Sequence, residues 1–252
     1  MNRRYAVLFA VLLALALTGC KTSETTAMTA TSQIILTPTP SIPDAQTSSY
    51  KYKVTADVGA LVVDAPIGNI TITGRNRPGI EVFADATYSS APPDIIRNVS
   101  GGTLTVGYTC PPQVPCRVTF VIEVPSDTAV SAVTSTGSIW LKNLTGTASA
   151  KAGAGYIYAA GLTGQTASFS TDAGGIDAAF TSPPVAVTAS TMFGTIEIQV
   201  PTTATYHLVT DAVAGRVIAT VPQGTAATST ITASTNLGSV EITPTVAAPV
   251  SS

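Results

Sequence analysis

The sequence has few of the residues that enzyme and metal sites depend on. It contains a single histidine, His207, and only three cysteines. A Ser–His–Asp triad would have to use that one histidine, and a structural or catalytic zinc site needs three or four protein ligands. His207 lies in an alternating segment that predicts a strand, with the histidine on the face opposite Tyr206 and Leu208. We therefore predict a surface histidine, no enzyme activity and no cofactor or metal.

Charged side chains are also scarce. They make up 10% of the residues, and the formal net charge is -2, whereas soluble proteins carry about 25% charged residues. The few lysines and arginines form no basic patch. This excludes nucleic-acid binding through phosphate contacts and a polybasic membrane-binding surface. We predict no nucleic-acid partner.

No apolar run is long enough for a transmembrane helix. The longest run, residues 6–17, has 12 residues and follows Arg3 and Arg4, whereas a helix needs about 20 apolar residues to cross a bilayer. A short apolar run after positive charges is typical of a secretory signal peptide. The chain is therefore predicted to be exported.

The end of this run carries a family resemblance. Leu17-Thr18-Gly19-Cys20 resembles the lipobox of bacterial lipoproteins. The resemblance implies that residues 1–19 are a signal peptide and that Cys20 receives a diacylglyceryl group and becomes the N-terminus. The alternative is an ordinary cleaved signal peptide with an unmodified cysteine. Two or three acyl chains would hold the protein firmly on a membrane, either the cell membrane or the outer membrane, facing away from the cytoplasm.

The segments that flank the main body have a different composition. Residues 20–49 are rich in Thr, Ser and Pro, and such a segment cannot bury enough apolar surface to offset its ordering entropy. We predict a disordered tether over residues 20–49 and a disordered tail over residues 246–252, with one folded domain over residues 50–245.

That domain is predicted to be all-β and repetitive. Apolar and polar residues alternate throughout, and a unit of Gly, any residue, Ile or Val, any residue and an apolar residue recurs. The glycines that begin the copies are Gly68, Gly137, Gly155, Gly174, Gly194, Gly215 and Gly238, with Gly102 beginning a looser copy. From Gly137 onward the spacings are 18, 19, 20, 21 and 23 residues.

A period of about 20 residues, with one glycine turn and one short strand per copy, favours stacked rungs. The predicted fold is a single-stranded right-handed β-solenoid, similar to a β-helix, and the alternative is a β-sandwich with hairpins at similar spacing. A tight corner between strands often needs a positive φ, which favours glycine.

The repeat also resembles a bacterial domain family. The segment Thr134-Ser135-Thr136-Gly137-Ser138-Ile139, after the Val124-Pro125-Ser126 strand end, is similar to the DUF4097 family, which carries the label "putative adhesin". The resemblance spans roughly residues 58–243 and implies a β-solenoid-like stack without defined catalytic chemistry. The aspartate typical after the glycine is missing from every copy here.

Two pairs of residues are candidates for specific bonds or chemistry. Cys110 and Cys116 enclose five residues, and in an exported protein they are predicted to form a disulfide. Closing so short a loop contributes roughly 2 kcal/mol. Asp172 and Asp177 flank one glycine corner. They could meet as a carboxylate pair for glycoside hydrolysis, although solvated turn residues are the simpler interpretation.

Three aromatic residues form the candidate interaction surface. Trp140, Tyr156 and Tyr158 follow successive glycine corners, and Trp140 and Tyr158 are one 18-residue repeat apart. Stacked rungs would place them side by side, either as a structural ladder or as a binding surface. We predict a surface protein for adhesion or envelope interaction, with an envelope glycan or protein as partner. An envelope-stress sensing module that binds a membrane protein is the alternative, and a glycan-active enzyme is a remote one.

Overall fold

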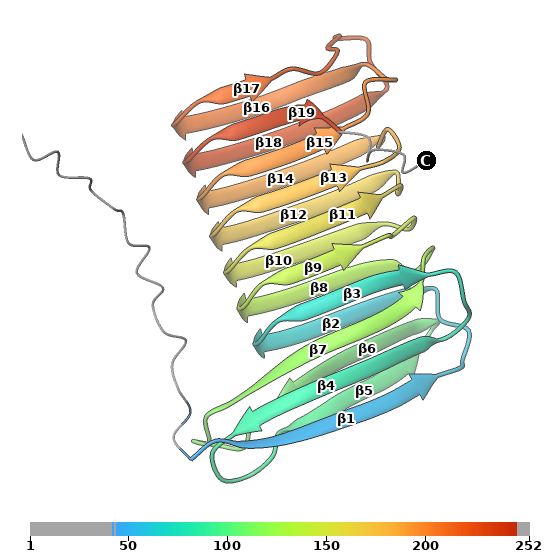
Figure 1. Cartoon of the computed structure of the whole chain (residues 1–252), viewed down its shortest axis with the longest axis vertical. Coiled ribbons are helices and arrows are strands. Elements are labelled where there is room, and N and C mark those ends of the chain that lie inside the picture. Colours follow the sequence, from blue (N-terminus) through green and yellow to red (C-terminus); the bar gives the residue numbers. More distant parts are fainter. Residues whose placement is uncertain (1–41, 43, 246–252) are drawn as a thin grey trace, which may run out of the picture. The chain divides into compact units, whose positions relative to one another are not determined.

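The computed structural model describes residue 42 and residues 44–245, and every regular element in them is a β-strand. The predicted signal peptide, Cys20, most of the tether and the tail of residues 246–252 lie outside the described residues. The strands form two sheets, one of 10 strands and one of 9 (Figure 1). The predicted all-β class is confirmed.

The 10-stranded sheet contains, in spatial order, β1 (Gln46–Val54), β4 (Ile80–Tyr88), β7 (Cys116–Pro125), β3 (Ile70–Arg75), β9 (Ile139–Lys142), β11 (Ile157–Leu162), β13 (Ile176–Phe180), β15 (Ile196–Val200), β19 (Val240–Pro244) and β17 (Val217–Ala219). The 9-stranded sheet contains β16 (Tyr206–Ala214), β18 (Ser229–Leu237), β14 (Ala186–Phe193), β12 (Thr166–Ala173), β10 (Ala148–Ala154), β8 (Ala129–Thr136), β2 (Ala60–Ile67), β6 (Thr103–Thr109) and β5 (Asp94–Ser100).

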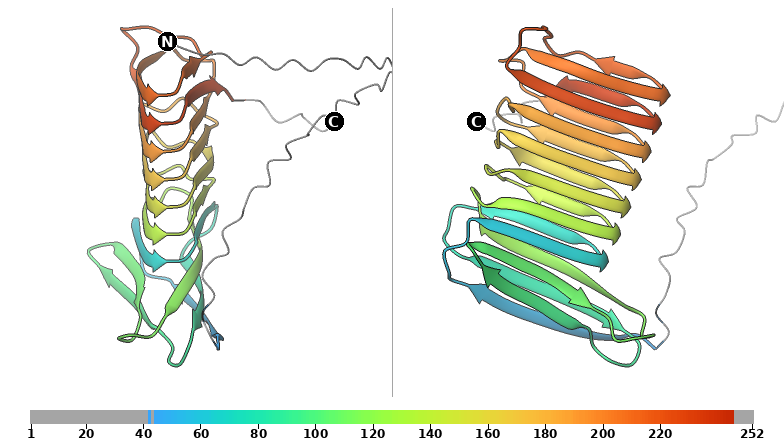
Figure 2. Two further views of the ribbon diagram at one scale, coloured as in Figure 1. Left: turned by 90° about the vertical axis from the view of Figure 1, so that its left-hand side faces the viewer. Right: turned by 180° about the vertical axis from the view of Figure 1, so that it is seen from behind.

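Each repeat supplies two strands, one to each sheet. In the repeat around Gly155, β10 precedes the glycine and β11 follows it, and both pair in parallel with their counterparts in the next repeat. Figure 2 shows the repeats as two layers of stacked strands. The expectation of one strand per copy was therefore wrong. The strands before the corners are rich in Ala, Ser and Thr, so their apolar alternation is weaker than that of the Ile-containing strands after the corners.

The core lies between the two sheets and follows the alternation in the sequence. In β11, Ile157 and Ala159 are buried while Tyr158 is exposed. Opposite them, β10 buries three alanines at every second position. Parallel pairing repeats this arrangement from rung to rung, with a register shift between β11 and β13 after Ala159. The buried residues build one continuous apolar cluster along the stack.

A buried threonine precedes most corner glycines by three residues. The Oγ1 atom of Thr171 donates a hydrogen bond of 3.0 Å to the carbonyl oxygen of Gly155 in the neighbouring rung, and Thr191 donates one of 3.0 Å to Gly174. Thr134 and Thr235 make the equivalent bonds to Gly68 and Gly194. These bonds explain the Thr-x-x-Gly part of the repeat, because the threonine side chains are buried and each hydroxyl finds its hydrogen-bond partner in a corner carbonyl of the neighbouring rung.

We expect Thr171→Val to lower the free energy of unfolding by about 1 kcal/mol, because the hydrogen bond between the buried Thr171 hydroxyl and the Gly155 carbonyl is lost. Thr166→Val, on an exposed position of the same strand, is the matched control and should cost less than about 0.5 kcal/mol. Guanidinium unfolding curves of both variants measure the difference. Equal shifts of the two midpoints would contradict the structural role of the buried hydroxyl.

The last two rungs are not stacked in sequence order. β18 pairs with β14 on one side and β16 on the other, and β19 likewise lies between β15 and β17. The rung at Gly238 is therefore inserted between those at Gly194 and Gly215. The segment that links β17 to β18 extends back along the last rung, where Gly224 donates a backbone hydrogen bond to Tyr206.

The opposite end of the stack is antiparallel. β1 pairs with β4, and β4 with β7, in one sheet, while β5 pairs with β6 in the other. Gly101 and Gly102 form the two-residue turn between β5 and β6, with φ values of 56° and 72°. The prediction that Gly102 begins a looser copy of the repeat was therefore wrong: the glycine pair is a hairpin turn.

The antiparallel end also contains the disulfide and the first strand of the domain. The disulfide between Cys110 and Cys116 is present, in the link between β6 and β7. The domain boundary needs a correction, because β1 begins at Gln46 and residues 46–49, predicted as tether, pair with β4. Thr and Ser are common in linkers but also suit a strand, so composition alone misplaced the boundary.

Within the described part of the chain, no helix is long and apolar enough to cross a membrane.

Candidate interaction surface

One row of outward-facing residues crosses the whole 10-stranded sheet in register. From the antiparallel end to the last rung it consists of Lys51, Phe83, Val121, Thr71, Trp140, Tyr158, Asp177, Glu197, Glu241 and Ile218. The type of side chain changes along the row: mixed residues come first, then aromatic residues and then acidic residues.

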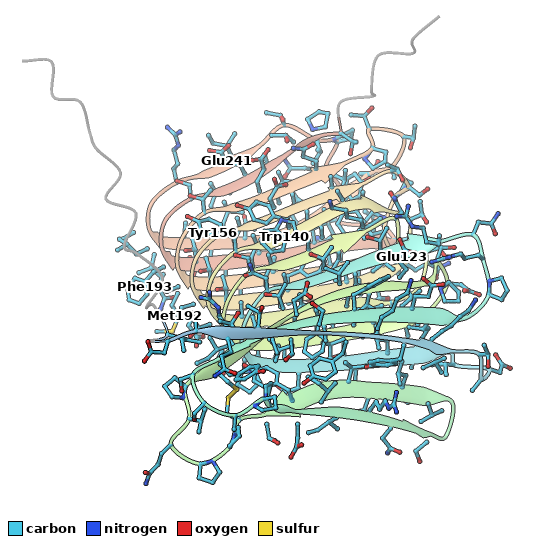
Figure 3. All side chains as sticks on the ribbon, turned by 60° about the horizontal axis from the view of Figure 1, so that its bottom comes forward. Glu123, Trp140, Tyr156, Met192, Phe193 and Glu241 are labelled. Atoms are coloured by element: carbon cyan, nitrogen blue, oxygen red, sulfur yellow. A yellow bond between two sulfur atoms is a disulfide. The ribbon has the colours of Figure 1, made fainter. Side chains whose placement is uncertain are left out.

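Trp140 and Tyr158, in the middle of the row, form an aromatic stack with Tyr156, which lies two residues before Tyr158 and outside the row. The ring centroids of Trp140 and Tyr158 are 5.7 Å apart with planes at 13°, and those of Tyr158 and Tyr156 are 5.8 Å apart with planes at 18°. Tyr156 is 52% exposed and Tyr158 37% exposed. Figure 3 shows Trp140 and Tyr156 on the outside of the sheet. The predicted side-by-side arrangement of these residues is present, and their role in binding stays a prediction.

Three carboxylates continue the row beyond the aromatic stack. This acidic row comprises Asp177, Glu197 and Glu241, on three neighbouring parallel strands. Burial, together with the negative charge of Glu197, raises the pKa of Asp177. Within residues 44–245, the only cation within ion-pairing distance of the row is Arg216, 3.9 Å from Glu241. Asp177 and Glu197 therefore carry negative charge that no lysine or arginine of the described chain offsets.

A shallow groove lies where the aromatic stack meets the acidic row. The residues that line it include Tyr156, Tyr158, Phe193, Thr195 and the corner glycines. The other residues that directly follow a corner glycine of the repeat carry a side chain, but Gly175 has none. A Cβ atom at Gly175 would lie 3.1 Å from the Tyr156 ring. The missing side chain thus leaves room for the tyrosine ring to pack against the backbone.

The opposite end of the same face carries balanced charges. Glu123 accepts hydrogen bonds from Arg75 and Arg77, which lower the pKa of its carboxyl group. Glu81 interacts with Arg77 and with Lys53. The lysine and arginine side chains are exposed and the two glutamates are partly exposed, and ion pairs at the surface contribute little to stability. Figure 3 shows Glu123 well separated from Glu241 along the sheet.

The other candidate residues do not come together as a catalytic site. Asp172 is exposed on β12 of the 9-stranded sheet, whereas Asp177 is on β13 of the 10-stranded sheet. The two acids face opposite outer surfaces, so the carboxylate pair considered beside the simpler interpretation does not form. His207 lies on β16, partly exposed. In the described residues, no group of three or more His, Cys, Asp or Glu side chains could hold a metal ion.

Sequence reasoning missed the acidic row and Phe193. Asp177, Glu197 and Glu241 each lie three residues after a corner glycine, the same offset as Trp140 and Tyr158. Alignment of the repeats on their glycines would have placed all five in one row. Phe193 directly precedes its corner glycine and is 54% exposed. It is the last residue of β14, one of the strands before the corners that were not predicted from the sequence.

The chain resembles several solved structures at low identity. A "putative cell adhesion protein" from Clostridium sporogenes aligns over 79% of this chain and 100% of its own, with 11% identity and a TM-score of 0.44. A "putative adhesin" from Bacteroides fragilis aligns over 77% and 97%, with 14% identity and a TM-score of 0.41. A "putative adhesin" from Parabacteroides distasonis aligns over 79% and 98%, with 11% identity and a TM-score of 0.36.

No protein-family model matches the chain. No curated protein matches it either. The resemblances to the DUF4097 family and to the lipobox therefore stay predictions, and no residue role is transferred from another protein.

Proposed function

We propose that the chain is a non-enzymatic, lipid-anchored protein of the bacterial cell surface. Lipid on Cys20 holds it to the cell membrane or outer membrane, residues 20–45 separate the domain from the membrane, and a right-handed β-solenoid presents the aromatic stack for adhesion or envelope interaction. The partner is an envelope glycan or protein.

The exposure of the aromatic stack is the observation that carries this proposal. Tyr and Trp are enriched at interfaces and dominate binding energy there. Single exposed apolar residues are common on protein surfaces, but adjacent exposed apolar residues mark binding sites. Aromatic residues make up only 6% of this chain, and here Trp140, Tyr156 and Tyr158 occupy two adjacent rungs of one face.

Cells that display the full chain test the proposal. We expect the double variant Trp140→Ala, Tyr158→Ala to reduce retention on surfaces coated with isolated cell envelopes by about tenfold or more, since hot-spot residues contribute at least 2 kcal/mol. Counting the cells retained after washing measures the effect.

Phe83→Ala is the matched control, because Phe83 is a partly exposed aromatic residue of the same row in the antiparallel part of the sheet. It should leave retention unchanged. Equal retention of the wild type and the double variant, at equal amounts of displayed protein, would exclude adhesion through the aromatic stack.

A further inference from the structure

The groove beside the aromatic stack has two unusual properties together. Two of the aromatic residues that line it are exposed to solvent, Tyr156 at 52% and Phe193 at 54%. Two carboxylates, Asp177 and Glu197, line it as well and lie on directly adjacent strands. An apolar ligand would leave these carboxylates without compensation, and an anionic ligand would be repelled by them. The groove therefore fits a ligand that is both flat enough to stack and positively charged.

The position of Tyr156 indicates where such a group would lie. Tyr156 packs against Gly175, which has no side chain, while about half of the tyrosine stays exposed in the groove. The rings of Trp140, Tyr158 and Tyr156 are nearly parallel. A planar group placed against the exposed part of the Tyr156 ring would extend this stack and would lie in the groove that Asp177 and Glu197 also line.

We propose that this groove binds arginine side chains of a protein partner. A guanidinium group is planar, stacks on aromatic rings and donates several hydrogen bonds at fixed angles to carboxylates. A cation over the face of an aromatic ring is attracted by the negative charge of the ring face. A lysine ammonium group is strongly hydrated and cannot stack in this way. Charge complementarity and the stack thus both favour arginine over lysine.

The spacing of the acidic row suits more than one arginine. Glu197 pairs in register with Asp177 on one side and with Glu241 on the other, so the carboxylates repeat at the strand separation of about 4.8 Å. Gln199 donates a hydrogen bond of 2.9 Å to Glu197 and holds one carboxylate oxygen in place. A partner segment that crosses the strands could therefore place a second arginine near Glu197 and Glu241. This inference rests on the proposed interaction function and names the class of its partner.

Fluorescence anisotropy with the full-length lipidated protein in detergent micelles tests the inference. The probe is a labelled glycine-rich peptide with two arginines, compared with the same peptide carrying two lysines or two citrullines. Citrulline keeps the planar shape but lacks the charge. We expect the arginine peptide to bind at least about tenfold more tightly than either of the others.

The double variant Asp177→Asn, Glu197→Gln should weaken binding of the arginine peptide by about tenfold or more, and Tyr156→Ala should weaken it similarly. Asp172→Asn combined with Asp211→Asn changes the net charge by the same amount on the opposite sheet, where both residues are exposed, and should have no effect.

Equal affinity for the three peptides would overturn the inference. It would also be overturned if the Asp172, Asp211 variant lost as much affinity for the arginine peptide as the Asp177, Glu197 variant. Tighter binding of a glucosamine oligomer, lost in the Asp177 and Glu197 variant, would overturn it in favour of an amino-sugar ligand. If the arginine peptide fails to bind while Trp140→Ala, Tyr158→Ala still abolishes adhesion, the arginine site is wrong and the adhesion function stands.

Discussion

Replacement of Gly174 by alanine is expected to destabilise the domain by about 4 kcal/mol or more. The φ angle of Gly174 is 146°, and an added Cβ atom would lie 1.9 Å from the carbonyl oxygen of Gly155. Backbone strain in such a region costs about 1–3 kcal/mol, and overpacking costs a similar amount. The contact is with the backbone of the neighbouring rung, so no side-chain rotation can relieve it. At about 2–4 °C for each kcal/mol in a domain of this size, the melting temperature should fall by roughly 8–16 °C.

Gly59→Ala is the control for this experiment. A Cβ atom at Gly59 meets nothing within 4 Å, and its φ lies outside the range that disfavours other residues. The fluorescence of Trp140, the only tryptophan of the chain, can follow the unfolding of both variants. A melting temperature for the Gly174 variant within 2–3 °C of that of the Gly59 variant would show that the corners tolerate a side chain, contrary to the stacked geometry.

The close contact at Gly174 also shows why the repeat could be found from sequence. Corner glycines lie directly above one another, and the carbonyl of each occupies the space in which a Cβ atom of the next would lie. This requirement recurs at Gly155, Gly174 and Gly194, so the glycine spacing is visible without a structure. The alternation of buried and exposed residues is visible for a simpler reason, because successive side chains of a strand point to opposite faces of the sheet, as they do in β13 and in the first part of β11.

Other features could not be predicted because they depend on which strands pair. The order of the last two rungs depends on β18 pairing with both β14 and β16, and the sequence of each strand is equally compatible with the sequential order. The separation of Asp172 from Asp177 depends on the assignment of β12 and β13 to different sheets. The two acids flank one glycine corner, and a pair at that corner was conceivable from the sequence, but the corner turns the chain from one sheet to the other.

The sequence predicted the aromatic part of the candidate site but not the acidic row or Gly175. Trp140 and Tyr158 are conspicuous because tryptophan and tyrosine are rare in this chain, and a period of 18 residues links them. The acids of the row are ordinary residues whose significance arises only from their shared offset after the corner glycine. Gly175 contributes to the groove by having no side chain, which no search for chemically distinctive residues would find.

Loss of the predicted lipid anchor on Cys20, which lies outside the described residues, is expected to have a large effect on membrane association. We expect Cys20→Ser to abolish metabolic labelling of the protein with palmitate, because the thiol is the predicted acceptor of the lipid. We also expect a chain in which an ordinary cleavable signal peptide replaces residues 1–20 to move from the membrane fraction to the soluble fraction outside the cytoplasm. Each buried methylene contributes about 0.8 kcal/mol, so the acyl chains beyond the first add on the order of 10 kcal/mol to membrane binding.

The matched control for the labelling experiment is the double variant Cys110→Ser, Cys116→Ser, which removes the other two cysteines of the chain. It should retain both the palmitate label and the membrane association, since its cysteines form the disulfide between β6 and β7. Palmitate label on the Cys20→Ser protein would place the lipid elsewhere. Membrane association of the chain with the replaced signal peptide would mean that the domain itself binds the membrane. In that case the outer face with the aromatic stack, rather than a lipid on Cys20, would be the first surface to test for the attachment.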